Sequence, residues 1–338
     1  MNNVLASCGI PRQPLEVLLY HTQKAEEDAI DFDESQPIDC SRYFVCPTLT
    51  PLYYTPIYQE LDEDQQRRYN QLTGLCFNEL IAFFETTFSA SVLAALAEMR
   101  SRGVTSALLD CLSGFMADER KHIQWWHQLN LLSEPSHYAT SEQRLIRFSP
   151  FAQKLLGSMT AHPRLFPVVF WCMLLLEERS MDISRRCLAM KRESIEPWYR
   201  LVHQHHVKDE ARHVQMDLYL IDLFFTNRSR ILRQLTAKFL SVMIGQFFLP
   251  PTRTARRVVQ CLVRERPALA PLFPEMIRQL KRLCQSGDYH EMMYSRNTTP
   301  ITFGMFDRFA EMHALQHVLR SYCPNNRRST DEGRLQAH

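Results

Sequence analysis

Glycine is scarce in this chain, at only 9 of 338 residues. Because glycine marks tight turns, bulges and flexible loops, its scarcity favours long helices joined by short connections. The sequence also lacks any long alternation of apolar and polar residues of the kind that strands show. These two absences predict an all-α fold, and 338 residues suffice to bury a large core.

Signatures of several other protein classes are missing as well. The ten cysteines lie singly and show no Cys-x-x-Cys spacing, which indicates reduced core thiols. No basic segment followed by an apolar run marks the N-terminus for export, and the longest apolar stretch, residues 165–176, is too short to span a bilayer. The net charge is +2, with basic residues only in small groups. We therefore expect a cytoplasmic protein with no nucleic-acid and no membrane partner.

Composition divides the chain into three parts. Residues 1–60 contain several prolines and an acidic patch, and we expect one short helix near residues 12–28 followed by extended chain packed on the outside of the fold. Residues 61–322 show helical periodicity and form the main domain. Residues 323–338 are expected to be a disordered tail.

Four long helices are predicted in the first part of the main domain, near residues 62–100, 104–130, 164–190 and 197–225. Pro163 and Pro167 open the third helix and Pro197 opens the fourth, where proline fits the first turn. The remainder of the domain predicts further helices near residues 228–248, 253–264, 271–285 and 305–321.

Two of the long helices carry the same motif, Glu119 with His122 and Glu210 with His213. The i, i+3 spacing places each carboxylate beside its imidazole on one helical face. About one Glu-x-x-His match is expected by chance, and residues 134–137, in a predicted loop, are a further match. The two helical motifs, however, lie on otherwise apolar faces, where an unpartnered carboxylate would be costly to bury. Metal ligation removes that cost, and such helix pairs are typical of the di-iron or di-manganese site in ferritin-like four-helix bundles.

A site of this kind takes one more glutamate from each of the other two long helices. The first helix offers Glu79 and Glu85, and we prefer Glu85 because it lies in the most apolar part. The third helix offers Glu177 and Glu178. Glu177 has the more apolar face and is preferred, while Glu178 remains an alternative, with Asp182 one turn on as its partner.

A third histidine separates this pattern from that of a plain ferritin. His206 lies four residues before Glu210, so that both share a face with His213 and could reach the same metal pair. His203 continues this stripe one turn earlier and is the weaker candidate, while His205 points elsewhere.

Residues 62–225 resemble the p-aminobenzoate N-oxygenase (AurF) family of di-iron oxygenases. The resemblance lies in residues 196–198 and 206–213, and in residues 72–74 followed by Asn78, Glu79 and Glu85. It implies a ferritin-like core with extra N- and C-terminal helices, and a set of seven metal ligands. Carried onto this chain, the set is Glu85, Glu119, His122, Glu177 or Glu178, His206, Glu210 and His213.

The resemblance also implies a function. Two Fe ions, reduced by an external electron donor, would bind O2 as co-substrate and form a peroxo-diferric intermediate. Whether manganese replaces part of the iron is left open. The family reaction is N-oxygenation of an aromatic amine to a nitro compound, usually in secondary-metabolite biosynthesis. Because one fold and metal site serve several chemistries, two alternatives remain open: a di-iron hydroxylase, desaturase or C–C cleaving oxidase, and a ferroxidase or iron-storage protein. An electron-donor protein is an expected partner, and a homodimer is left open.

Overall fold

The computed structural model of the chain describes residues 12–25, 30–33, 35–101, 106–249 and 252–324. Among these residues there is no strand, and one isolated backbone bridge joins Tyr43 to Ile195. The predicted all-α fold is confirmed. Of the expected disordered tail, residues 325–338 lie outside the described residues.

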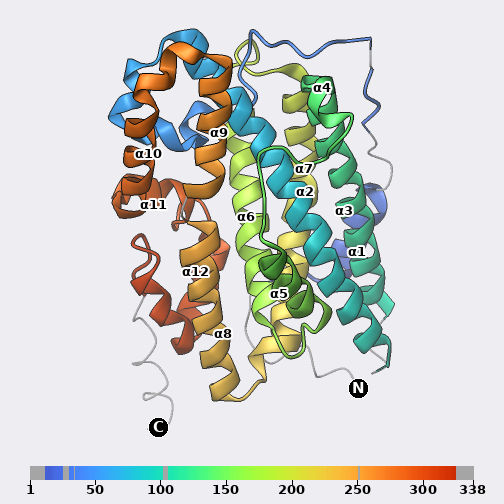
Figure 1. Cartoon of the computed structure of the whole chain (residues 1–338). Helices are drawn as coiled ribbons and strands as arrows, with labels where there is room; N and C mark the ends of the chain where they lie inside the picture. The colour runs from blue at the N-terminus through green and yellow to red at the C-terminus, as the bar shows by residue number, and fades with distance from the viewer. Residues whose placement is uncertain (1–11, 26–29, 34, 102–105, 250–251, 325–338) are drawn as a thin grey trace.

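Four long helices form the core: α2 (Glu63–Ser101), α3 (Ser106–Ser133), α6 (Val168–Leu188) and α7 (Pro197–Ile221). Helix α2 packs on α3 and α6, and α7 also packs on α3 and α6, so that the four helices enclose one interior (Figure 1). This arrangement is a ferritin-like four-helix bundle. Each helix coincides with one of the four predicted long helices, and the largest difference is that α6 begins at Val168, after a turn at residues 163–165.

Local sequence signals explain where the bundle helices begin. The Asp62 side chain accepts a hydrogen bond from the backbone N–H of Gln65 at 2.8 Å, and the Gln65 side chain accepts one from the N–H of Asp62 at 3.2 Å. This reciprocal pair satisfies two N–H groups that the first turn of α2 leaves free. At α7, Pro197 takes the first turn and the Glu196 carboxylate accepts from the N–H of Tyr199 at 2.9 Å.

Helix α2 is long and apolar enough, by length and composition alone, to cross a membrane. In the structure, however, it packs against α3, α5, α6 and α9, and it buries polar side chains such as Asn78, Glu79 and Glu85. Polar groups of this kind are satisfied by neighbouring protein elements and not by lipid. Helix α2 is therefore the core helix of the bundle.

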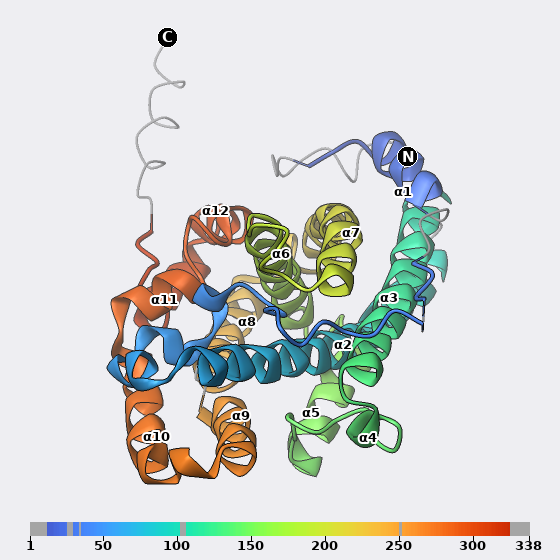
Figure 2. The same cartoon turned by 90° about the horizontal axis from the view of Figure 1, so that it is seen from above.

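The remaining elements surround the bundle (Figures 1 and 2). Helix α1 (Leu15–Ala25) packs on α3 and α7, and α5 (Pro150–Ala161) packs on α2. Short 3₁₀ segments η1 (Pro47–Leu49), η2 (Pro51–Tyr54) and η3 (Pro56–Glu60) each begin at a proline, within a region predicted to be extended. The other short elements are α4 (Pro135–Tyr138) and the π-helical turn η4 (Asp222–Thr226).

The C-terminal elements lie to the left of the bundle in Figure 1. They are α8 (Arg230–Met243), η5 (Ile244–Phe248), α9 (Thr252–Glu265), η6 (Pro267–Leu272), α10 (Phe273–Arg282), η7 (Leu283–Gln285), α11 (Gly287–Met293), α12 (Pro300–Arg308) and η8 (Ala310–His317). The predicted helix at 305–321 was wrong in extent, because α12 starts at Pro300 and the chain tightens to a 3₁₀ segment after Arg308. Helices α5 and α11 were not predicted.

Candidate metal centre

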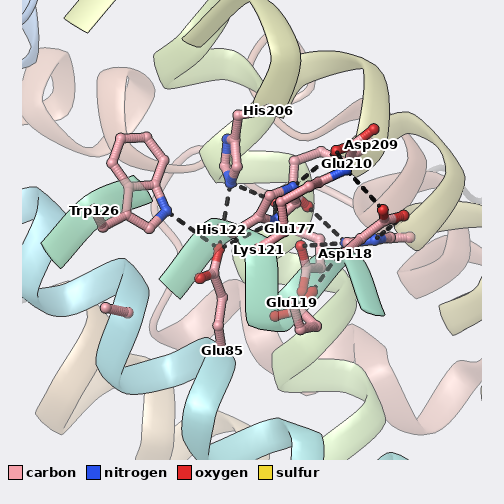
Figure 3. Close-up of polar contacts among 12 residues, drawn as sticks. Glu85, Asp118, Glu119, Lys121, His122, Trp126, Glu177, His206, Asp209 and Glu210 are labelled. Carbon is pink, nitrogen blue, oxygen red and sulfur yellow. Dashed lines mark hydrogen bonds and ion pairs between the residues drawn. The ribbon is translucent and has the colours of Figure 1, made fainter. Parts of the chain in front are cut away.

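Seven side chains from the four bundle helices converge at the middle of the bundle (Figure 3). All seven are buried. Helix α2 supplies one, α3 two, α6 one and α7 three: Glu85, Glu119, His122, Glu177, His206, Glu210 and His213. Three groups among them have ligand atoms close enough to one another to hold a metal ion.

One group of donors gathers around Glu85. His206 Nε2 lies 3.3 Å from Glu85 Oε1 and 2.6 Å from Glu210 Oε1. His122 Nδ1 lies 3.6 Å from the same Glu85 oxygen and 3.8 Å from the same Glu210 oxygen. Two carboxylates and two imidazoles thus surround one point, which we name site A.

The other group gathers around His213. Its Nδ1 lies 3.0 Å from Glu119 Oε1, 3.8 Å from Glu177 Oε2 and 3.5 Å from Glu210 Oε2. We name this point site B. The two oxygens of Glu210 therefore face different sites, and Glu119 groups with His122 of site A as well as with His213. Glu210 and Glu119 are placed to bridge two metal ions, which carboxylates commonly do in this fold.

The donor atoms fit a pair of metal ions. Glu85 Oε2, both oxygens of Glu119 and of Glu210, and Nδ1 of His122 and of His213 are buried, and although several of them lie within 4 Å of another atom of the set, none has the geometry of a hydrogen bond with a described residue. Buried polar atoms in native proteins rarely lack a partner, so a converging set without one indicates a missing ligand. Four carboxylates also carry the charge that balances two divalent cations, and carboxylate with imidazole is a donor set that suits iron.

Electrostatics make the centre costly to leave empty. Burial and the nearby charge of Glu85 raise the pKa of Glu119 to about 7. Burial and Glu210 raise the pKa of Glu177 well above its usual value. Burial alone would lower the pKa of His122, but the carboxylates of Asp209 and Glu85 raise it to about 10. Without metal, protonated imidazoles offset the carboxylates, and metal ions would displace those protons.

His122 and His206 each make a hydrogen bond through the ring nitrogen that faces away from the centre, and His213 has an aspartate near its own outer nitrogen but no hydrogen bond to it. His122 Nε2 lies 3.0 Å from Asp209 Oδ2, and His213 Nε2 lies 3.5 Å from Asp118 Oδ2. His206 Nδ1 lies 3.3 Å from the hydroxyl of Ser184. Such partners fix the tautomer and the ring orientation of a metal-binding histidine.

The two Asp-Glu-x-x-His motifs support each other across the bundle. Asp118 on α3 faces His213 on α7, and Asp209 on α7 faces His122 on α3. Lys121 Nζ lies 2.9 Å from both aspartates, and Arg212 Nη2 lies 2.7 Å from both. Two carboxylates and two cations thereby form a neutral cluster behind the metal centre, which lets both aspartates stay ionised although they are buried.

Glu178, the alternative to Glu177, points away from the centre. Its Oε1 accepts a hydrogen bond from the backbone N–H of Ile301 at 2.7 Å, and its Oε2 accepts one from the N–H of Thr302 at 2.8 Å. The carboxylate therefore caps the N-terminus of α12. We therefore remove Glu178 from the proposed ligand set. Asp182, considered as its partner, instead pairs with Arg179 and Arg186.

The other candidates considered in the sequence are also engaged elsewhere. The Glu79 carboxylate accepts the Tyr138 hydroxyl at 2.7 Å and the backbone N–H groups of residues 144–146 at 2.8–3.0 Å. His203 Nδ1 lies 3.1 Å from the Ser184 hydroxyl, and burial lowers its pKa to about 3. The His205 ring faces Trp125.

Comparison with known proteins agrees with this geometry. The sequence profile of the family described as P-aminobenzoate N-oxygenase AurF matches residues 12–285. This chain belongs to the AurF family. The match confirms the resemblance and extends it beyond residues 62–225, into α1 at one end and α8 to α10 at the other. No curated protein matches the chain. Membership in the AurF family implies an oxygenase.

A cavity of about 220 Å³ adjoins the metal centre of this AurF-family chain. Glu85, Glu177 and Glu210 line it on one side, so the cavity reaches the centre from the side of α2 and α6. Most of its wall is aromatic or aliphatic, contributed by α2, α5's preceding loop, η5, α9 and α11. Polar groups come from Arg179 and Ser180 on α6 and from Tyr289 and Tyr294.

Sequence reasoning did not assign the residues that support the AurF-type centre. Asp118, Asp209, Lys121 and Arg212 occupy matching positions in the two motifs, one before the glutamate and one before the histidine. That repetition was a signal available in the sequence. The α9 and α11 side chains of the cavity carried no such signal, because they meet the bundle only through tertiary packing.

Proposed function

We propose that this chain is a non-haem di-iron oxygenase that N-oxygenates an aryl amine towards a nitro compound. The observation that carries the proposal is the pair of sites sharing Glu210, with Glu85, Glu177 and Glu210 lining a largely apolar cavity. The ligands are proposed to be Glu85, His122 and His206 at site A, Glu177 and His213 at site B, and Glu119 and Glu210 between them.

The chemistry would come from the metal, and the protein would control it. Two bound iron ions, reduced by an external electron donor, supply O2 activation. Asp209, Asp118 and Ser184 hold the three imidazoles in one orientation. The second imidazole at site A adds a neutral donor there, so that the two metal positions are not equivalent. The apolar wall keeps bulk water from the reacting atoms.

The cavity also supports an aromatic substrate. Phe84, Phe88 and Phe148 line it, and aromatic side chains bind an aryl ring by offset or edge-to-face contact. Its volume of about 220 Å³ suits a single-ring compound with small substituents. An amine nitrogen directed at the three cavity-facing carboxylates would lie beside the metal pair.

Turnover of 4-aminobenzoate by the iron-loaded protein with a chemical reductant and O2 tests the proposal. We expect the hydroxylamine and then the nitro compound as products, and loss of both in the His206→Ala variant. His203→Ala is the matched control, because His203 is also buried on the same helix but belongs to none of the donor groups of the two sites. Hydroxylation or desaturation of other substrates without any N-oxygenation of an aryl amine panel would replace this reaction. Accumulation of hundreds of irons would indicate storage.

We further propose a cytoplasmic enzyme of secondary metabolism that takes its electrons from a separate donor protein. The AurF family match supports an oxygenase, and an oxygenase of this type requires reducing equivalents for each turnover. Fractionation of the producing cells and reduction assays with cellular extracts would test these points.

A further inference from the structure

A basic surface lies beside the cavity, on α5, α8, η5 and the start of α9. Two segments build it, residues 143–176 and 223–264, and neither contains any Asp or Glu. Together they carry twelve Arg or Lys residues, although the whole chain has 39 basic and 37 acidic residues. Six of the twelve are exposed and form no ion pair with a described residue: Arg147, Lys154, Arg230, Lys238, Arg253 and Arg256.

Large apolar side chains stand out from the same surface. Helix α8 buries Ala237 and Leu240 in the core, yet its outer side exposes a stripe at positions 231, 235, 239 and 242. This stripe runs for about 16 Å along the helix. Phe151 on α5 is 76% exposed and Ile231 on α8 is 70% exposed. Large apolar side chains this exposed are unusual, and an exposed apolar stripe such as that of α8 marks a candidate interaction site.

Helices α5 and α8 both contribute side chains to one apolar hollow. Leu155 and Met159 of α5 line it on one side, and Met243 and Phe247 on the other. Phe247 also lines the cavity at the metal centre, and it is 44% exposed. The cavity therefore adjoins the basic, apolar surface at Phe247. We name this surface, comprising α5, α8, η5 and the start of α9, the α5–α8 face.

Basic charge continues to the cavity wall. Phe148 and Val258 line the cavity, and they follow Arg147 and Arg257 directly in the chain. Burial and the charge of Arg147 lower the pKa of Arg257, and the charge of Glu79 offsets part of this effect.

We propose that the α5–α8 face binds the surface of an anionic lipid membrane. The exposed apolar side chains would enter the acyl boundary while the unpaired Arg and Lys residues meet the lipid headgroups. The sequence predicted no membrane partner because its longest apolar stretch is too short to span a bilayer, and that argument does not bear on contact with the membrane surface. Resting on the proposed function, we infer in addition that the substrate is a lipophilic amine that enters the cavity from the lipid.

A lipid surface fits the face better than other occupants. A second copy would bring the same positive charge against it, with no acid in these segments to compensate. A folded acidic protein would need hollows to receive side chains as prominent as Phe151 and Ile231. A bilayer offers negative charge and an apolar interior together and needs no matching shape.

Sedimentation of the full chain with vesicles tests the proposal. We expect binding to vesicles of phosphatidylcholine with phosphatidylglycerol, at least tenfold weaker binding to phosphatidylcholine alone, and weakening by salt. The double variant Lys154→Glu with Lys238→Glu should lose about tenfold or more in binding. Leu235→Ser with Phe239→Ser should lose it to a similar extent, and since both residues are exposed the fold should persist.

Matched controls lie on other elements. Lys281→Glu with Arg282→Glu on α10 makes the same change in net charge, and Tyr53→Ser on η2 removes a side chain that is 39% exposed. Both should bind like the unmodified protein. Equal binding to the two vesicle types, or no binding to either, would overturn the proposal. Unchanged binding of the variant Leu235→Ser with Phe239→Ser would also overturn it. A dimer that dissociates on Phe239→Ser would assign the face to a second copy instead. None of these measurements uses iron or turnover, so they are independent of the proposed reaction. The substrate inference has a separate test, in which vesicles should stimulate the turnover of a lipophilic aryl amine.

Discussion

The carboxylate of Asp209 on α7 lies 3.0 Å from Nε2 of His122 on α3. Asp209 precedes Glu210 in the chain, so one helix supplies both a proposed ligand and the group that orients a ligand on the facing helix. Across the bundle, Asp118 on α3 lies near His213 on α7 in a looser version of the same pairing, at 3.5 Å and without a hydrogen bond. The centre is thus built from two helices that each depend on the other for their geometry.

Removal of the Asp209 charge should weaken metal binding without removing a ligand. We expect Asp209→Asn to lower iron affinity by about 10- to 100-fold, because His122 loses the acceptor that holds its ring. Equilibrium dialysis of Fe(II) under anaerobic conditions measures this. Asp110→Asn, an exposed change on the same helix as His122, serves as the control and should leave affinity unchanged. Equal affinity in the two variants would contradict the positioning role.

Glu177 and Glu178 should separate into a binding role and a structural role. Glu177→Gln should lower the iron content, and in the metal-free protein it should raise Tm, because burial and Glu210 oppose ionisation of Glu177. Glu178→Gln should keep the iron content but lose about 1–3 kcal/mol of stability, since the amide NH2 group of Gln cannot accept one of the two backbone N–H groups at the start of α12 and leaves it without a partner. Iron analysis and thermal melts of both variants test this, and the reverse pattern would refute the assignment.

Glu79 should prove structural although it lies on the same helix as Glu85. Glu79→Ala leaves Tyr138 and the buried N–H groups of Leu145 and Ile146 without their acceptor. We expect a loss of about 3 kcal/mol or more in the free energy of unfolding, measured with urea. The variant should still bind iron when it is folded. A stable variant that had lost iron would instead place Glu79 among the ligands.

Metal removal should destabilise the protein, because the folded chain then loses the free energy of metal binding at this buried centre, which the unfolded chain does not have. Iron at about 1,000 times its Kd should add about 4 kcal/mol to the free energy of unfolding. Calorimetry before and after chelation measures the difference, and the effect should be much smaller in Glu210→Ala. An unchanged Tm on chelation of the unmodified protein would show that the cluster is stable by itself.

Much of this fold could be predicted because its determinants are local. The spacing of Glu119 to His122 and of His206 to Glu210 follows from helical geometry alone, and so did the four bundle helices. The choice between Glu177 and Glu178 could not be made this way. It depends on the start of α12, more than 120 residues later in the chain.

Other features escaped prediction for the same reason. The role of Glu79 depends on the chain after Tyr138, and the cavity depends on α9 and α11 reaching the bundle. Helix α5 had a usable local signal in Ser149 and Pro150, a cap followed by a proline at the first position. Helix α12 begins at Pro300 in the same way.

The most direct test of the account is the iron content of the full chain after anaerobic loading with Fe(II) and removal of free metal. The arrangement of sites A and B around Glu210 predicts two irons per chain, and less than one in Glu210→Ala, because that carboxylate faces both sites. A protein that retains no iron, or a Glu210→Ala variant that still holds two, would contradict it.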